Sequence, residues 1–257
     1  MNTLNLKKVQ WRDLCTLTKW EIFIENTLTL PWLAASWLLA WLGWYWLAVP
    51  FSFVFFLTAL RQVHNGFHKS LGTGKFFTWF SLFSNSILMM ASIHAVKFNH
   101  LRHHKYCLTE EDHEGHCARL PWYKALLYGP VHIAKIHYFT FKLGNRNYRL
   151  NMLAELVALT TFAALAFIFD IDFLKYHVVI MLLGEAFSAF FAVWSVHHDC
   201  EDAVGRTQRS WWKNAITFNM FYHLEHHLFP AVPTIKLPEL ARRLDVALPQ
   251  IPKHSTF

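Results

Sequence analysis

Three histidine boxes in this sequence have spacings that suit metal binding. The first box is the pair His64 and His68. The other two have histidines at relative positions 0, 3 and 4: His100, His103 and His104 in the second box, and His223, His226 and His227 in the third. Residues three and four apart share one face of a helix, so one metal ion can take two imidazoles from a box. We predict that the three boxes bind metal together.

The number of histidines indicates two metal ions rather than one. The boxes offer eight imidazoles, and His197 or His198 would add a ninth. A single ion takes roughly three to six ligands, whereas eight or nine can serve two ions and leave positions open for oxygen and water. Imidazole binds iron, zinc, copper and nickel alike, so the ligand type leaves the metal open. For any one box alone, solvated histidines at a membrane surface are the alternative.

The composition places these boxes in a membrane protein. The 257-residue chain is 54% hydrophobic and 16% charged, against roughly 25% charged residues in soluble domains. Lys and Arg outnumber Asp and Glu by 24 to 17, and we assign the excess to cytoplasmic segments that face anionic lipid. No basic and aromatic footprint of nucleic-acid binding is evident, so we expect no nucleic-acid partner. The four cysteines include no CxxC pair, and we expect reduced thiols.

Two hydrophobic hairpins, with four membrane spans, are predicted. Residues 26–60 carry no charge and fit two spans with a tight turn near Trp46–Pro50, the second span running on into the first box. Residues 152–169 and 176–196 form the other hairpin around the acidic turn 170–172. Segments rich in Lys and Arg bracket this hairpin on the side of the histidines. We therefore place the boxes and both termini in the cytoplasm.

Residues 76–96 are uncharged and long enough to cross the bilayer, but we interpret them as an in-plane or re-entrant segment. A full crossing would put the first and second boxes on opposite sides of the membrane. The predicted fold is thus an all-α integral membrane protein with two transmembrane hairpins, a re-entrant segment and a cytoplasmic histidine-rich cap. We treat residues 1–257 as one domain, with an amphipathic interfacial segment at 1–26. Residues 197–257 form the cytoplasmic part, with a helix near 237–246.

The order HxxxH, HxxHH, HxxHH, with hydrophobic hairpins before the first and third boxes, resembles the membrane fatty acid desaturase superfamily over roughly residues 45–240. The string HLEHHLFPAVP, its TFNMFY lead-in and the preceding RTQRS are similar to the acyl desaturase branch. Carotenoid ketolases share the HxxHH and HHLxPxVP patterns. The resemblance implies a non-haem di-iron centre held by these histidines, which activates O2 and removes hydrogen from an unactivated carbon. It also implies an external ferredoxin or cytochrome, since no haem, flavin or iron–sulfur motif is evident.

The ninth ligand implied by the resemblance follows the last predicted span. Both His197 and His198 stand there. In the related ketolase pattern a histidine follows three residues after a tryptophan, and Trp194 makes His197 the match, with His198 possible in its place. Stearoyl-type enzymes often carry an asparagine one turn before this ligand. Val193 stands there instead, so the sequence does not support a water-mediated contact of that kind.

Carboxylates near the boxes are expected to orient the imidazoles through their second ring nitrogen. Asp112, Asp199 and Glu225 are the candidates, and a solvated carboxylate is the alternative for each. His113 and His116 do not fit the family spacing, and we do not count them as ligands.

Glu185 stands near the middle of the last predicted span with no basic residue within a turn. A carboxylate inside a membrane is a functional candidate by default. Two interpretations are open: Glu185 contacts a polar part of the substrate in its pocket, or it bonds Thr160 or Thr161 of a neighbouring helix.

We therefore expect a membrane oxidoreductase that uses O2 and two iron ions to introduce a double bond into a fatty acyl chain. The alternative is a hydroxylase or ketolase of a carotenoid, alkane or other lipophilic substrate, because the two outcomes diverge only after the first hydrogen is removed. The second alternative is a membrane haem or metal-binding protein. Haem ligands should lie inside spans on facing helices, whereas these histidines lie outside the spans. The sequence leaves substrate, double-bond position and oligomeric state open.

Overall fold

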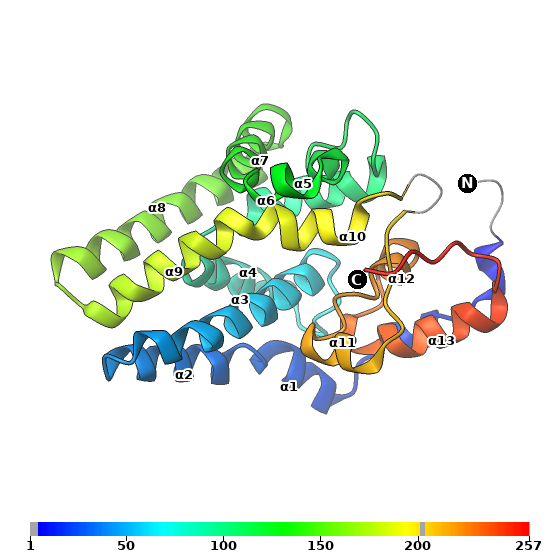
Figure 1. Cartoon of the computed structure of the whole chain (residues 1–257), viewed down its shortest axis with the longest axis horizontal. Coiled ribbons are helices and arrows are strands. Elements are labelled where there is room, and N and C mark those ends of the chain that lie inside the picture. Colours follow the sequence, from blue (N-terminus) through cyan, green and yellow to red (C-terminus); the bar gives the residue numbers. More distant parts are fainter. Residues whose placement is uncertain (1–4, 201–203, 257) are drawn as a thin grey trace.

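The computed structural model describes residues 5–200 and 204–256, and in these residues helices predominate (Figure 1). In chain order they are α1 (Lys19–Thr27), α2 (Leu30–Trp41), α3 (Tyr45–Phe67), α4 (Lys75–Met89), α5 (Ile93–Tyr106), α6 (Trp122–Leu126), α7 (Gly129–Leu143), α8 (Arg146–Ile168), α9 (Asp172–Ser188), α10 (Ser195–His197), α11 (Trp211–Ile216), α12 (His223–Leu228) and α13 (Leu237–Ala247). A π-helical turn at Ala189–Trp194 joins α9 to α10. The all-α prediction is confirmed, and α13 matches the helix expected near 237–246.

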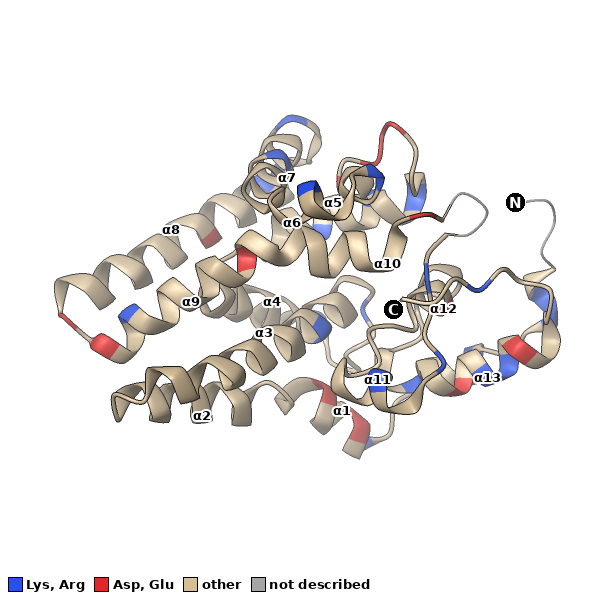
Figure 2. Cartoon of the chain, in the orientation of Figure 1, with Lys and Arg blue, Asp and Glu red and all other residues tan. Residues whose placement is uncertain are grey.

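Four helical stretches of the described residues are long and apolar enough to cross a membrane, as predicted. They are Lys19–Trp41, Tyr45–Phe67, Arg146–Ile168 and Asp172–His197. They form two hairpins whose turns lie at the same end of the molecule (Figure 1). Charged residues are sparse in the middle of the spans, and most of those in the chain gather toward the other end (Figure 2). This is the charge distribution of an integral membrane protein.

The turn of the first hairpin lies at Leu42–Trp44, so its predicted position near Trp46–Pro50 is wrong. The first span begins at Lys19 and thus takes in residues that we had assigned to the interfacial segment, which moves the turn toward the N-terminus. Gly43 has a φ of +78°, a conformation that glycine adopts without strain. Pro50 is therefore inside α3, where it removes one backbone hydrogen bond near the start of the helix.

Residues 5–18 pack on the C-terminal cap, by which we mean the described residues 204–256, rather than form an amphipathic segment. Two short 3-10 turns precede α1. Val9 and Leu14 are buried in one core with residues of α12 and α13, and Arg243 of α13 pairs with Asp13 at 2.8 Å. The described ends of the chain thus stabilise the part that carries the third box. Residues 1–4, 201–203 and 257, which belong to the predicted N-terminal and C-terminal parts, lie outside the described residues.

The segment 76–96 bends sharply between α4 and α5. The two helices meet at an angle of 111°, and Met90 has a left-handed φ of +58°. Glu155 of α8 holds the bend: its carboxylate accepts hydrogen bonds from the Ser92 hydroxyl at 2.8 Å and the His94 backbone N–H at 3.0 Å, and it lies 2.5 Å from His94 Nδ1. The bend brings the second box to the end of the bundle where α3 ends, as the re-entrant interpretation requires.

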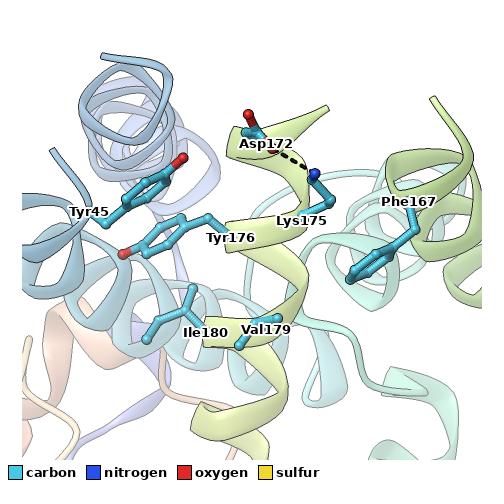
Figure 3. A pocket seen from close by; sticks show the side chains of 7 residues that line it. All are labelled: Tyr45, Phe167, Asp172, Lys175, Tyr176, Val179 and Ile180. Atoms are coloured by element: carbon cyan, nitrogen blue, oxygen red, sulfur yellow. Dashed lines mark ion pairs between the residues drawn. The ribbon is translucent and has the colours of Figure 1, made fainter. Parts of the chain in front are cut away.

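A shallow groove of about 340 Å³ lies at the hairpin-turn end of the spans, and Figure 3 shows the side chains that line it. It is lined by Tyr45, Phe167, Asp172, Lys175, Tyr176, Val179 and Ile180. The Lys175 ammonium pairs with Asp170 at 2.5 Å and with Asp172 at 2.6 Å. The single ammonium leaves one of the two carboxylate charges unbalanced. The chemistry that the sequence predicts lies at the opposite end.

Candidate metal centre

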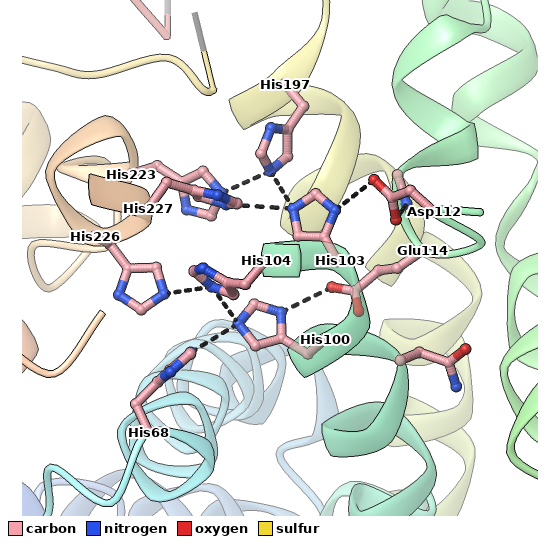
Figure 4. Close-up of polar contacts among 12 residues, drawn as sticks. His68, His100, His103, His104, Asp112, Glu114, His197, His223, His226 and His227 are labelled. Atoms are coloured by element: carbon pink, nitrogen blue, oxygen red, sulfur yellow. Dashed lines mark hydrogen bonds and ion pairs between the residues drawn. The ribbon is translucent and has the colours of Figure 1, made fainter. Parts of the chain in front are cut away.

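The three boxes and His197 lie close together at one end of the bundle. Figure 4 labels all of these histidines except His64. The end of α3 supplies the first box, α5 the second, α10 His197 and α12 the third. The nine imidazoles divide into two groups, and within each group one possible ligand atom per residue lies within 4.8 Å of the others. The five-histidine group is His64, His68, His100, His104 and His226. The four-histidine group is His103, His197, His223 and His227.

In the five-histidine group, ring nitrogens face one another at contact distance. His100 Nε2 is 3.2 Å from His68 Nε2 and 3.1 Å from His104 Nε2, and His226 Nε2 is 3.0 Å from His104 Nε2. His64 lies in the same group, with its ring centre 4.0 Å from that of His226. Both ring nitrogens of His64 are buried and have no hydrogen-bond partner among the described residues. A metal ion bound to one of these nitrogens would satisfy it.

In the four-histidine group, the Nε2 atoms form a closed ring. His197 Nε2 is 2.9 Å from that of His103 and 2.8 Å from that of His223. His227 Nε2 is 3.1 Å from that of His223 and 3.2 Å from that of His103. A donor Nε2 carries one hydrogen, and even if donors and acceptors alternate around the ring, two hydrogens cannot serve all four contacts. Adjacent ligands at right angles on an ion with bonds of about 2.1 Å are about 3.0 Å apart, which fits these separations.

The histidines of the third box are in the form that binds metals. Burial, together with the neighbouring histidines, lowers the pKa of His223, His226 and His227 well below the ordinary range. They are therefore neutral at physiological pH and have a lone pair for an ion. The residues present fit two buried metal ions, one in each group.

Asp112, one of the three carboxylates chosen from the sequence, contacts His103. Its carboxylate lies 2.7 Å from His103 Nδ1 and accepts from the backbone N–H groups of Leu108 and Gly115, both at 2.8 Å. Burial alone would raise the pKa of Asp112, but these donors hold it at about 2. A carboxylate on Nδ1 fixes the hydrogen there and leaves Nε2 free to bind an ion.

Glu114 makes the matching contact in the five-histidine group, and sequence reasoning missed it. Its Oε1 lies 3.0 Å from His100 Nδ1 (Figure 4). Burial raises the pKa of Glu114 to about 8. From the acidic run 110–116 we had chosen only Asp112 as an orienting carboxylate. A signal was present in the sequence: the carboxylates Asp112 and Glu114 are two residues apart and follow closely after the second box.

Three other histidines named in the sequence analysis lie outside both groups. The ring of His198 stacks on Trp194 with 3.9 Å between ring centres, and its Nδ1 lies 2.8 Å from the Trp194 carbonyl oxygen. His197 and not His198 therefore faces the other boxes. His113 stacks on Phe139, and the ring of His116 lies near Tyr128.

Glu225 and Asp199 do not make the contacts with imidazoles that we expected. The fully buried Glu225 carboxylate accepts from the Thr207 hydroxyl at 2.7 Å and from Arg209 at 2.6 Å, so it ties α12 to the RTQRS segment. Its direction follows from the helix: a residue one position before His226 points about 100° away from it. Asp199 is exposed and makes no hydrogen bond to a histidine among the described residues.

Glu185 is buried in α9, twelve residues or about 18 Å of helix before His197. Its carboxylate makes no hydrogen bond with another described residue, so the expected alternative of a bond to Thr160 or Thr161 is not observed.

Asn65, inside the first box, connects that box to the chain after the third. Its side-chain oxygen accepts from the Thr234 backbone N–H at 3.1 Å and hydroxyl at 2.7 Å, and its amide nitrogen donates to Glu25 at 2.8 Å. Glu25 also pairs with Arg61 of α3. All four side chains have at most a small exposed fraction, so the network is a rigid support between the boxes. Sequence spacing gave no sign of it.

The known proteins that this chain resembles are lipid desaturases. The family model described as fatty acid desaturase matches residues 35–256. The sphingolipid delta(4)-desaturase DES1 of Mus musculus is 24% identical over 265 residues, which cover 92% of this chain and 77% of that protein. The sphingolipid delta(4)-desaturase DES1 of Drosophila melanogaster is 48% identical over 44 residues, 17% of this chain and 14% of that protein. No solved structure matches significantly.

Proposed function

This chain belongs to the fatty acid desaturase family of oxidoreductases, and we propose that it introduces a double bond into the acyl chain of a membrane lipid with O2 as the oxidant. The observation that carries the proposal is the division of nine histidines from three boxes and α10 into groups of five and four. Each group has enough ligands for one ion, and the smaller group leaves more of its ion open.

Two iron ions are the proposed metals, one in the five-histidine group and one in the four-histidine group. When bound, they supply the activation of O2 and the removal of hydrogen from an unactivated C–H bond. The residues of the chain hold the ions and orient the imidazoles that bind them. Asp112 and Glu114 keep Nε2 of His103 and of His100 free for the ions. Burial of the boxes keeps bulk water from the site, which favours reaction with the substrate over side reactions.

The overall reaction requires electrons from outside. Removal of two hydrogens from the chain and reduction of O2 to two waters consumes two further electrons and two protons. We propose a ferredoxin or cytochrome as donor, on the cytoplasmic side. The end of the molecule that carries the boxes is also the end with most of the Lys and Arg residues (Figure 2), which suits an acidic donor and a cytoplasmic location of the boxes.

The proposed substrate is a lipid with a long alkyl chain. The names of the two relatives make a sphingolipid the first substrate to test, with a glycerolipid and an acyl thioester beside it. Glu185 is the proposed contact for a polar part of the substrate, because it is a buried carboxylate within a span and makes no hydrogen bond with another described residue.

Product analysis tests the reaction. Membranes that contain the protein, a reducing system and O2 should yield a product that lacks two hydrogens relative to the substrate, as measured by mass spectrometry. A product that gains one oxygen atom would favour the hydroxylase or ketolase alternative. His226→Ala should abolish product, whereas His198→Ala is the matched control, since His198 stacks on Trp194 outside both groups.

A further inference from the structure

Helix α11 lies in the cap and has an exposed apolar face. Trp211 is 80% exposed, Trp212 51% and Ile216 62%. Asn214, on the other face, is buried and donates to the Gln208 backbone oxygen at 2.8 Å. The sequence interpretation put this helix in water, as part of the cytoplasmic residues 197–257. Two exposed tryptophans and an isoleucine on one short helix are unfavourable in water and indicate a surface that something else covers.

The chain just after α11 is attached to a membrane-spanning hairpin. The backbone oxygen of Phe218 accepts a hydrogen bond from Arg61 of α3 at 3.1 Å, and the ring of Phe218 packs edge-on against Trp32 of α2 with 6.5 Å between centres. Arg61 is the first charged residue after the charge-free stretch 26–60, so it marks a boundary of the hydrocarbon region. Trp32 lies six residues inside that stretch, about 9 Å of helix. Helix α11 is therefore at the level of the bilayer boundary.

Helix α1 presents similar side chains at the same boundary. Trp20 and Phe23 are exposed and stack with 5.2 Å between ring centres, at the start of the span Lys19–Trp41. Glu25 of α1 pairs with the same Arg61 that bonds Phe218. The exposed faces of α1 and α11 are thus connected through one guanidinium. Tryptophans concentrate at membrane interfaces because their rings are apolar and carry one polar N–H.

The charge on α11 also suits lipid. The Lys213 ammonium lies 5.7 Å from the centre of the Trp212 ring, beside the apolar face. An amphipathic helix with tryptophan on one side and lysine near its edge binds in the headgroup region, and the lysine adds attraction to anionic lipid.

We propose that α11 is an in-plane membrane-binding helix, and that Trp211, Trp212 and Ile216 enter the headgroup boundary on the side of the histidines. The occupant of this surface is lipid, because the surface is continuous with the lipid-facing hairpin of α2 and α3. The contact also fixes the third box, since a short turn joins α11 to His223 and the Asn219 backbone N–H bonds the Asn214 oxygen at 2.8 Å. A test of this membrane contact requires neither bound iron nor turnover.

Photo-crosslinking tests the contact in the full-length protein. A diazirine amino acid is placed at position 211 or 216, and the protein is reconstituted in vesicles of phosphatidylcholine and phosphatidylserine. The matched control is position 246 on α13, where Val246 is also apolar and 77% exposed but lies on a helix farther from the spans (Figure 1). After illumination, mass spectrometry should find at least about tenfold more lipid adducts at 211 and 216 than at 246.

Two results would overturn the proposal. One is a lipid adduct yield at 211 and 216 no higher than at 246. The other is cross-linking of these positions to protein, either a second copy of this chain or a partner, in place of lipid. Size-exclusion chromatography and circular dichroism establish that each variant is folded before illumination. Since no step depends on iron or turnover, failure here is distinguishable from failure of the proposed reaction.

Discussion

The two histidine groups share helices α5 and α12 but differ in ligand number and in support. The five-histidine group has one orienting carboxylate, Glu114, whose second oxygen is buried without a partner among the described residues. The four-histidine group has Asp112, which receives three N–H groups. The neighbours His226 and His227 belong to different groups, as do His103 and His104. Each HxxHH box therefore contributes histidines to both groups, which our interpretation of its histidines as one helix face did not anticipate.

The largest effects are expected from alanine substitution of the neighbours His226 and His227, which belong to different groups. His226→Ala removes a ligand of the five-histidine group, and His227→Ala one of the four-histidine group. Each should reduce desaturation to background, a loss of about a thousandfold or more, and lower iron from two ions per chain toward one, as measured by elemental analysis. The iron that remains should have a different Mössbauer spectrum in the two variants. Identical spectra, or an equal loss in His198→Ala, would contradict the division into two groups.

The second prediction compares the iron affinity of two variants that each lack one orienting carboxylate. Asp112→Ala frees three N–H donors and Glu114→Ala one, so the first should weaken iron binding more. Loss of such a contact costs about 10-fold to 100-fold in metal affinity, and we expect Asp112→Ala near the upper value and Glu114→Ala near the lower. Chelator titration of the iron-loaded protein measures both. A larger loss of iron affinity in Glu114→Ala than in Asp112→Ala would show that the number of N–H donors to the carboxylate does not determine how strongly it supports iron binding.

Glu155 tests what the two groups have in common, because α5 supplies histidines to both. Glu155→Ala leaves the Ser92 hydroxyl and two groups of His94 without their acceptor at the bend. We expect a loss of about 3 kcal/mol in stability and a parallel decrease of iron in both groups. Thermal unfolding in detergent and elemental analysis provide the measurements. Glu155→Gln keeps an acceptor oxygen, so its stability and iron content should lie between those of Glu155→Ala and of the wild-type protein.

The smallest effect is expected at Glu225, a carboxylate next to the third box that contacts no imidazole. Glu225→Gln weakens the bonds to Arg209 and Thr207 and should lower stability by about 2 kcal/mol. Iron affinity should change less than twofold, in contrast to Asp112→Ala. Asp199→Asn, at an exposed site, serves as the control without effect on either quantity. A large decrease in iron affinity in Glu225→Gln would mean that the third box depends on this carboxylate.

The spans and the gathering of the histidines could be predicted because their signals are local. Long apolar stretches with few charged residues define the four spans, and the spacings of the boxes place imidazoles on helix ends. The re-entrant interpretation of 76–96 came from a requirement rather than a pattern, since the boxes had to meet. The bend supports it, but the residue that holds the bend, Glu155, lies more than fifty residues later in a different span.

Helix packing also explains why several other contacts were not predicted. Glu114, Asn65 and Glu225 have partners that depend on how helices pack, which spacing along one segment does not encode. The first hairpin turn was misplaced because the absence of charge marks the hydrocarbon region and not the helix ends. Gly43, which makes the turn, lies within the uncharged stretch. The exposed face of α11 was missed because the whole segment 197–257 was assigned to the cytoplasm and membrane contact was not sought there.

The metal content of the purified wild-type chain tests the central claim most directly. Elemental analysis and an absorption spectrum of protein reconstituted with ferrous iron in the absence of O2 require no knowledge of the substrate. Two histidine groups predict two irons per chain and no Soret band. A single zinc, a single iron or a haem spectrum would contradict the account.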